Sequence, residues 1–354
     1  MNLKHFKTYT KQDLLSLTRL RKFETKLGER INVIKEDASL ANSIAGLSAK
    51  YVLVGVPEDI GVLANGGING TSTAWFYFLQ SFLNIQSNDF LEGSELVVLG
   101  YFDFNELQSL IDKNAHDFDE KIDAYRHAVN AIDDEVETLI KAIVVAGKIP
   151  LIIGGGHNNA YPLLKGAAKG LHQLQQVQLA QINCINLDAH SDYRPAEGRH
   201  SGNAFRYAED DGFLQKYCVV GLHENYLPQN VWMDIVNDPF IDIITYEDIF
   251  IHEKRTFRQA VSHAIDFTED NYTGIELDLD AIENVLSSAV TPSGISVQQA
   301  RQYLNLAAAH AKVAYLHICE GAAQLSAGQT NETIGKTISF LLSDFVKMHN
   351  SVKA

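Results

Sequence analysis

The stretch from Asp188 to Asp192 carries the residues with the clearest capacity for chemistry. Asp188, His190 and Asp192 stand at alternate positions directly after an apolar run. Successive side chains of an extended chain point to opposite sides, so residues two apart share a side and can bind one ion. Carboxylate and imidazole groups bind hard or borderline divalent cations. The stretch therefore predicts a metal site.

Two further strings supply the same kinds of ligand. His157 follows the glycines Gly154–Gly156 at the end of an apolar run, and Asp278 and Asp280 end another such run. The three strings together offer two histidines and four aspartates. This set is larger than one catalytic ion needs when it keeps a position open for water, so we expect two ions that share carboxylates. Mn²⁺ suits these ligands, and a pair of such ions activates water at neutral pH.

The elements that must position these residues form an alternating pattern. Short apolar runs rich in Val and Ile alternate with helix-length segments, which is typical of a parallel sheet covered on both faces. We expect a three-layer α/β/α fold with a mostly parallel eight-stranded sheet. The predicted strands are Tyr51–Val56, Glu95–Gly100, Ile149–Ile153, Ile182–Leu187, Tyr217–Leu222, Ile241–Ile244, Thr273–Leu277 and Val313–Ile318. Ligands bind at the carboxyl ends of the strands in such sheets, so the three strings and Glu320 are expected in one site.

Helical spacing and end signals predict the connecting elements. A helix is expected over Lys121–Ala146, before Gly147, and a capping box of Ser296 and Gln299 opens another through His310. A closing helix is expected over Asn331–Met348. The first 50 residues show helical periodicity and no strand-like run. We therefore divide the chain into an N-terminal helical extension, 1–50, and a single α/β domain, 51–354.

Composition narrows the class of protein. The 354 residues are 46% hydrophobic and 21% charged, which is enough for a large core. A formal net charge of −15 disfavours nucleic acid and anionic membranes as partners, and no apolar run reaches the roughly 18 to 20 residues of a membrane span. Cys184, Cys218 and Cys319 lie in apolar runs and are expected to be free thiols. With no continuous apolar core for a secretory signal near the N-terminus, these features favour the cytoplasm.

In their order along the chain, the strings GGGH, DAHSD, LDLD and HICEG resemble those of the ureohydrolase family. This family comprises binuclear manganese enzymes and includes arginase, agmatinase and formimidoylglutamase. The similarity begins near Val52, takes in the glycine-rich stretch Gly61–Gly70, and reaches the final helix. It implies an arginase-like fold, two Mn²⁺ ions per subunit and assembly into a homo-oligomer. The implied ligands are His157, Asp188, Asp192 and Asp278 for the first ion, and Asp188, His190, Asp278 and Asp280 for the second.

The resemblance also implies the reaction. Activated water would attack the trigonal carbon of a guanidino or formimino group in a small molecule, and the tetrahedral intermediate would collapse with C–N cleavage. Asp280 is expected to orient the attacking water and relay its proton, and Glu320 to pair with the cationic nitrogens of the substrate. With the ligand Asp192, they are the candidate catalytic residues.

The string that begins at Ser201 bears on the substrate. Ser201 and Asn203 stand where the family contacts a substrate carboxylate. Arg206, in the same string, is a candidate to bind that carboxylate, and Arg194 and Arg199 are weaker candidates. The SGNAFR string, with Phe where arginases have His, and GGGH both resemble the formimidoylglutamase branch. Where arginases place an aspartate for the substrate amino group, this chain has GLHENY. We therefore expect hydrolysis of N-formimidoyl-L-glutamate to L-glutamate and formamide.

Two departures from the family pattern keep alternatives open. Glu276 stands where the family usually has Ser or Thr, and Glu283-Asn284 replaces a usual Asp-Pro. A buried Glu276 would need a cationic or donor partner. The alternatives are a hydrolase of arginine, agmatine or a guanidino acid that releases urea, a non-catalytic metal-binding relative, and a mononuclear zinc deacetylase in which Asp280 has no role.

Overall fold

A computed structural model describes residues 3–34 and 39–352 of the chain. Within these ranges one sheet has nine strands in the order β1-β3-β2-β4-β9-β8-β5-β6-β7. Neighbouring strands are parallel, except that β1 runs antiparallel to β3. The strands are β1 (Phe6–Thr8), β2 (Tyr51–Gly55), β3 (Leu96–Phe102), β4 (Ile149–Ile153), β5 (Ile182–Leu187), β6 (Leu214–Leu222), β7 (Ile241–Thr245), β8 (Thr273–Asp278) and β9 (Val313–Cys319).

The eight predicted strands are confirmed, and the predicted count of eight is corrected to nine. The additional strand, β1, belongs to the N-terminal segment, in which only helices were expected. It pairs Phe6 with Phe102 at the edge of the sheet. A three-residue edge strand that is bonded on one side and mostly exposed needs no apolar run, so its sequence carries no strand signal. The division of the chain at residue 50 stays a prediction.

Helices connect the strands and cover the sheet. The three predicted helices are confirmed as α7, α13 and α14. The predicted capping box opens α13, where Gln299 N donates to Ser296 Oγ at 3.2 Å and Ser296 N donates to Gln299 Oε1 at 2.8 Å. No described helix is long and apolar enough to cross a membrane. The helices are α1 (Lys11–Leu17), α2 (Leu27–Arg30), α3 (Leu40–Ala45), α4 (Ile60–Ala64), α5 (Ala74–Phe82), α6 (Asn105–Asn114), α7 (Phe118–Val145), α8 (Ala160–Gln173), α9 (Ala204–Asp210), α10 (Gln229–Val236), α11 (Tyr246–Phe250), α12 (Phe257–Thr268), α13 (Val297–Ala307) and α14 (Ile334–Val352).

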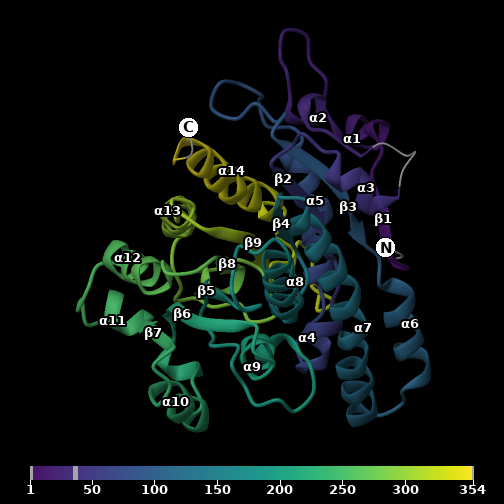
Figure 1. Ribbon diagram of the computed structural model, residues 1–354. Helices are drawn as coiled ribbons and strands as arrows, with labels where there is room; N and C mark the ends of the chain where they lie inside the picture. Colours follow the sequence, from purple (N-terminus) through teal and green to yellow (C-terminus); the bar gives the residue numbers. More distant parts are fainter. Residues whose placement is uncertain (1–2, 35–38, 353–354) are drawn as a thin grey trace.

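Side chains that alternate along the buried strands create one core on each face of the sheet. Val52 and Val54 belong to the core that contains α4, α7 and α8, whereas Leu53 belongs to the core that contains α5, α12, α13 and α14. Figure 1 shows α7 and α8 together on one side of the sheet and α12, α13 and α14 on the other. The expected three-layer α/β/α architecture is confirmed.

The order of the strands brings the site together. β4, β9, β8 and β5 are consecutive neighbours in the middle of the sheet, although other strands and helices separate them along the chain. Because they are parallel, their carboxyl ends meet at one edge. His157, Glu320, Asp278 and Asp188 follow or end these four strands, so they meet at that edge.

Candidate metal centre

A tight turn at the end of β4 positions His157. Gly154 and Gly155 have φ angles of +91° and +77°, which are in the left-handed region that glycine adopts without strain. A Cβ atom on Gly155 would lie only 2.5 Å from the carbonyl oxygen of Val56. The glycines therefore let the chain turn closely past Val56, just after β2, before His157 begins a short 3₁₀ turn, His157–Asn159.

At the end of β5, hydrogen bonds hold both carboxylate oxygens of Asp188. Asn186 Nδ2 donates to Asp188 Oδ2 at 2.9 Å, and His190 N donates to Asp188 Oδ1 at 2.7 Å. Asp192 then lies in the left-handed region, with φ +44°. The string expected on one extended strand thus bends after Asp188, because β5 ends at Leu187.

The end of β8 supplies the second pair of carboxylates. β8 ends at Asp278, and a 3₁₀ turn, Leu279–Ala281, follows. Asp280 N donates to Asp278 Oδ1 at 2.8 Å, which caps this turn and leaves Asp278 Oδ2 facing the neighbouring strings. Both residues are almost fully buried.

These strings form two groups of potential ligand atoms. In the first ligand group, His157 Nδ1 lies 2.8 Å from Asp192 Oδ2 and 3.2 Å from both Asp188 Oδ2 and Asp278 Oδ2. The second ligand group consists of Asp188, His190 and Asp280, with His190 Nδ1 3.1 Å from Asp280 Oδ2 and 3.7 Å from Asp188 Oδ1. Asp188 thus belongs to both groups, as a bridging ligand would. Asp278 falls in the first group only, so its bridging role stays a prediction.

The electrostatics of the cluster fit divalent cations. His157 Nδ1 is buried without a hydrogen-bond partner, although three carboxylate oxygens lie within 3.2 Å of it. Burial, followed by the negative charge of Asp188, raises the pKa of Asp192 to about 6. Burial and the neighbouring charges of Asp280 and Asp188 also raise the pKa of Asp278 well above its ordinary value. Divalent ions would offset this repulsion, and the carboxylate and imidazole donors suit Mn²⁺.

Glu320 lies beside the ligands at the end of β9. Its backbone has φ +61°, and its Oε1 accepts a hydrogen bond from His157 N at 2.8 Å. Burial, followed by the negative charge of Asp280, raises the pKa of the Glu320 carboxyl to about 8. Glu320 also lines the cavity next to the ligands, so its predicted contact with a substrate is geometrically open.

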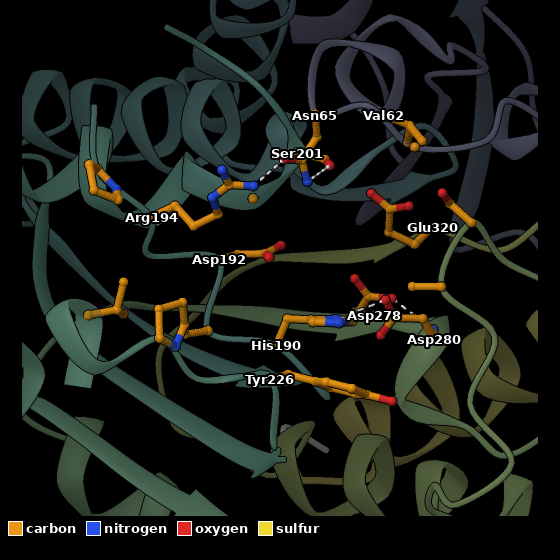
Figure 2. Close-up of a pocket in the computed structure, with 18 of the residues that line it drawn as sticks. Val62, Asn65, His190, Asp192, Arg194, Ser201, Tyr226, Asp278, Asp280 and Glu320 are labelled. Carbon is orange, nitrogen blue, oxygen red and sulfur yellow. Dashed lines mark hydrogen bonds and ion pairs between the residues drawn. The ribbon is translucent and has the colours of Figure 1, made fainter. Parts of the chain in front are cut away.

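A cavity of about 570 Å³ opens over this cluster. Figure 2 shows His190, Asp278, Asp280 and Tyr226 on one side of it and Arg194, Asn65 and Ser201 on another. The lining residues are Val62, Asn65, Gly67, His190, Ser191, Asp192, Arg194, Pro195, Glu197, Ser201, Gly202, Tyr226, Pro228, Asn230, Val231, Asp278, Asp280, Ser288, Ala289 and Glu320.

A chain of hydrogen bonds forms the polar end of the cavity. Arg194 Nη1 donates to Asn65 Oδ1 at 2.7 Å, and Asn65 Nδ2 donates to Ser201 Oγ at 3.3 Å. Arg194 Nη2 also pairs with Glu197 Oε1 at 2.8 Å. Among the lining residues of the described chain, Arg194 is the only lysine or arginine. The sequence analysis made Arg194 a weaker candidate for binding a carboxylate, but its side chain reaches the cavity.

Three of the predicted carboxylate contacts, two in the string from Ser201 and one just before it, lie elsewhere. Arg206 stacks 4.0 Å from the Tyr193 ring centroid and pairs with Asp234, and it does not line the cavity. Asn203 is buried and holds its own loop, because its Nδ2 donates to the carbonyl of Gly198 at 2.8 Å. The third, Arg199, is committed to a buried ion pair with Asp133 at 2.9 Å. Helix α9 begins at Ala204 and turns Arg206 away from Ser201, so only Ser201 of the three predicted contacts in this string lines the cavity.

Tyr226 and Asn65 line the cavity, although neither had a role in the sequence analysis. Tyr226 stacks on His190 with ring centroids 4.9 Å apart and planes at 18°, and it covers the second ligand group. The sequence feature that indicates a role for Tyr226 is the GLHENY string after β6, which departs from the arginase pattern. Asn65 lies in the glycine-rich stretch Gly61–Gly70, whose closeness to the site depends on the parallel pairing of β2 with β4.

Fold and site together define an α/β protein with a candidate two-metal centre of carboxylates and histidines at the carboxyl edge of a parallel sheet. A sequence model of the arginase family matches residues 49–342, and the chain belongs to this family. It is accordingly a hydrolase of the ureohydrolase type, which acts on amidine or guanidino groups.

Several proteins of this family are similar to the chain in sequence or in fold. A formimidoylglutamase from Streptococcus pyogenes serotype M3 is 24% identical over 236 residues, which is 65% of this chain and 70% of the relative. The crystal structure of formimidoylglutamase from Bacillus subtilis is similar in fold, with a TM-score of 0.69, 17% identity and 94% of each chain covered. A formiminoglutamase variant from Trypanosoma cruzi with Mn²⁺ is also similar, with a TM-score of 0.68, 19% identity, and coverage of 92% of this chain and 98% of that one.

Proposed function

We propose that this protein is a dimanganese formimidoylglutamase, which converts N-formimidoyl-L-glutamate and water to L-glutamate and formamide. The observation that carries the proposal is one cavity lined both by members of the two ligand groups, His190, Asp192, Asp278 and Asp280, and by Arg194. The name shared by the Streptococcus, Bacillus and Trypanosoma relatives supports the same reaction.

The two sides of the cavity fit the two ends of that substrate. Arginine binds carboxylates through two parallel hydrogen bonds, so Arg194 would hold a substrate carboxylate, with Asn65 and Ser201 beside it. Agmatine carries a cationic tail, which Arg194 would repel. The formimino group would lie at the other side, against the ligand groups and Glu320.

Each of the six candidate ligands would bind one or both of the metal ions. His157, Asp188, Asp192 and Asp278 would hold one Mn²⁺ ion, and Asp188, His190, Asp278 and Asp280 the other. When bound, the two ions would polarise water and make it nucleophilic at neutral pH. Tyr226, stacked on His190, would limit the access of bulk water to this end of the cavity.

Asp280 would transfer protons, and Glu320 would orient the substrate. Asp280 Oδ1 is buried without a hydrogen-bond partner, so it can accept a proton from the attacking water and pass it to the departing nitrogen. Glu320 uses its Oε1 for His157 N, and its second oxygen can accept an N–H of the formimino group. Addition of water to the formimino carbon and cleavage of its bond to the glutamate nitrogen then give formamide and glutamate.

A product assay tests this proposal. The Mn²⁺-loaded protein is incubated separately with N-formimidoyl-L-glutamate, arginine, agmatine and a guanidino acid, and formamide, urea and ammonia are measured. We expect formamide from the first compound and no urea from the others. Rapid release of urea without formamide would show that the substrate assignment is wrong.

A hydrolase of a guanidino acid is the second candidate. Glu197 pairs with Arg194 at 2.8 Å, and Asp192, Asp278, Asp280 and Glu320 make the cavity strongly acidic. An acidic cavity with one arginine would also accept a guanidinium group that carries a carboxylate tail. Release of urea from the guanidino acid alone would favour this candidate.

We also propose that the protein acts in the cytoplasm, because Cys184, Cys218 and Cys319 are all buried free thiols. Assembly into a homo-oligomer stays a prediction.

A further inference from the structure

Glu276 is a fully buried carboxylate that lies deeper in the sheet than the first ligand group. It precedes Asp278 by two residues on β8, so the two side chains lie on the same face of the sheet. In the register of the strands, Glu276 is paired with His317 of β9 and with Asn186 of β5. A carboxylate is stable in the protein interior only when hydrogen-bond donors surround it. Glu276, which stands where the family usually has Ser or Thr, therefore needs such donors.

Two side chains of β9 provide these partners. Tyr315 Oη donates to Glu276 Oε1 at 2.7 Å, and His317 Nδ1 lies 2.6 Å from Glu276 Oε2. Tyr315 and His317 are themselves fully buried, and they alternate along β9 on the face of Glu276. The carboxylate is thus held at both oxygens, directly beneath the cluster.

The far nitrogen of His157 faces this carboxylate. His157 turns Nδ1 toward the first ligand group, whereas its Nε2 is buried and has no hydrogen-bond partner. Among the described residues, the one carboxylate oxygen within 4.0 Å of this Nε2 is Glu276 Oε2, at 3.5 Å. The thiol of Cys319 is also close, but it donates to the carbonyl of Leu277 at 3.7 Å. An imidazole that binds a metal through one nitrogen carries its proton on the other and donates it to an acceptor.

We propose that Glu276 is a positioning residue, whose carboxylate accepts the Nε2 proton of His157 and so keeps the Nδ1 lone pair directed at the first ligand group. This inference rests on the metal centre of the proposed function and adds a residue outside its ligand set. The contact fixes the tautomer and the orientation of the ring and makes the imidazole a stronger ligand. Partners of this kind typically change metal affinity 10- to 100-fold.

Manganese binding to Glu276→Gln tests the role directly, because glutamine keeps the shape and removes the charge. Mn²⁺ affinities are measured by titration calorimetry, and electron paramagnetic resonance distinguishes single ions from coupled pairs. We expect the affinity of one Mn²⁺ ion to fall about 10- to 100-fold, so that single-ion spectra appear at Mn²⁺ levels that give coupled pairs in the unsubstituted protein.

Two further variants separate positioning from folding. Tyr315→Phe removes one donor to Glu276 and leaves the carboxylate in place, and we expect a smaller loss of affinity for the same ion. Asp133→Asn changes another buried carboxylate, which pairs with Arg199 and lies in neither ligand group. We expect it to lower the unfolding temperature without changing Mn²⁺ affinity.

The outcomes distinguish this inference from the proposed function. If the unsubstituted protein binds no Mn²⁺, the proposed function fails. If it binds two ions and Glu276→Gln binds both with unchanged affinity, only the positioning role is wrong. If Glu276→Gln does not fold, unchanged affinity in Tyr315→Phe overturns the role. A third Mn²⁺ equivalent that disappears in Glu276→Gln would make Glu276 a ligand, with His157, His317 and Cys319 in range, and would also overturn it.

Discussion

At the scale of single residues, Arg194 and Arg206 differ in what their guanidinium groups reach. Arg194 lines the cavity and bonds to Asn65, whereas Arg206 packs on Tyr193 and pairs with Asp234 outside it. Both follow the string Asp188–Asp192 closely in the sequence. Selectivity for a carboxylate-bearing substrate should therefore depend on Arg194.

Arg194→Gln is expected to raise KM for N-formimidoyl-L-glutamate about 10- to 100-fold and to change kcat much less. The physical reason is the loss of a charge-assisted hydrogen bond, worth about 1.5–3 kcal/mol, at a group remote from the reacting carbon. Steady-state kinetics measure both constants. Arg206→Gln is the matched control, with KM expected within about threefold of the unsubstituted enzyme. A large KM effect in Arg206→Gln and none in Arg194→Gln would reverse the assignment.

At the scale of elements, the turn between β4 and His157 depends on a glycine that no other residue can replace without strain. Gly155 combines φ +77° with a close approach to Val56. Gly147, before β4, has a similar φ of +71°, but a Cβ atom there would meet nothing within 4 Å. Substitutions at Gly155 and Gly147 therefore separate the energetic cost of the left-handed conformation from that of the close contact with Val56.

Gly155→Ala should lower the free energy of unfolding by about 3 kcal/mol and reduce Mn²⁺ content, because relief of the contact displaces His157. Gly147→Ala should cost only about 1 kcal/mol, from the left-handed conformation alone, and leave Mn²⁺ content unchanged. Urea denaturation and metal analysis give the two quantities. Equal losses in both variants would show that the contact with Val56 is unimportant.

The short 3₁₀ turn Ser201–Asn203 contains a built-in sensitivity to acid through His200, which precedes it. His200 Nδ1 accepts a hydrogen bond from Gly202 N at 3.1 Å, and the ring is fully buried. Burial, and then the positive charges of Arg194, Arg126 and Arg199, lower the pKa of His200 to about 3. In the unfolded chain His200 takes up a proton near its ordinary pKa of 6.5, whereas in the folded protein it stays neutral until about pH 3. Its effect on stability is therefore favourable above pH 6.5 and is lost progressively as the pH falls below that value.

His200→Asn should remove this part of the acid sensitivity, since asparagine does not titrate and still offers an acceptor to Gly202 N. Between pH 6.5 and 4.5 the unsubstituted protein should lose roughly 2 kcal/mol more stability than the variant, because one group contributes at most about 1.4 kcal/mol per pH unit. Chemical denaturation at several pH values measures the difference. Parallel pH profiles for the two proteins would contradict the buried neutral state of His200.

At the scale of the whole molecule, bound metal should stabilise the fold as well as supply chemistry. The ligands come from the ends of three strands, β4, β5 and β8, which are held together only in the folded chain. Ions that bind the folded state and not the unfolded chain stabilise it by about 2.7 kcal/mol per site at a hundredfold excess over Kd.

Removal of Mn²⁺ with a chelator should lower the unfolding temperature by about 5 °C, and addition of Mn²⁺ should restore it. Differential scanning calorimetry follows both changes. Asp188→Asn, which alters the residue common to both ligand groups, is the control, and its unfolding temperature should not respond to the chelator. An equal response in this variant would place the stabilising ions elsewhere.

The sequence by itself determined eight of the nine described strands, three of the described helices and the candidate ligands, because these depend on local patterns. Buried parallel strands are apolar along their length, so eight were recognised, and β4 and β5 were predicted with their observed bounds. The six candidate ligands lay in short strings at strand ends, where α/β sheets bind ligands. The edge strand β1 has no such pattern, and it was not predicted.

Only the tertiary structure decided the strand order that brings the expected site together and the contacts around it. The order β4-β9-β8-β5 brings together strings that are far apart in the chain, and nothing local in the sequence specifies this order. The direction of α9 decided that Ser201 faces the cavity and Arg206 does not. The register of β8 with β9 gave Glu276 the donors Tyr315 and His317. Spacing along a strand fixes the side to which a residue points, but contacts between strands depend on the packing of the whole sheet.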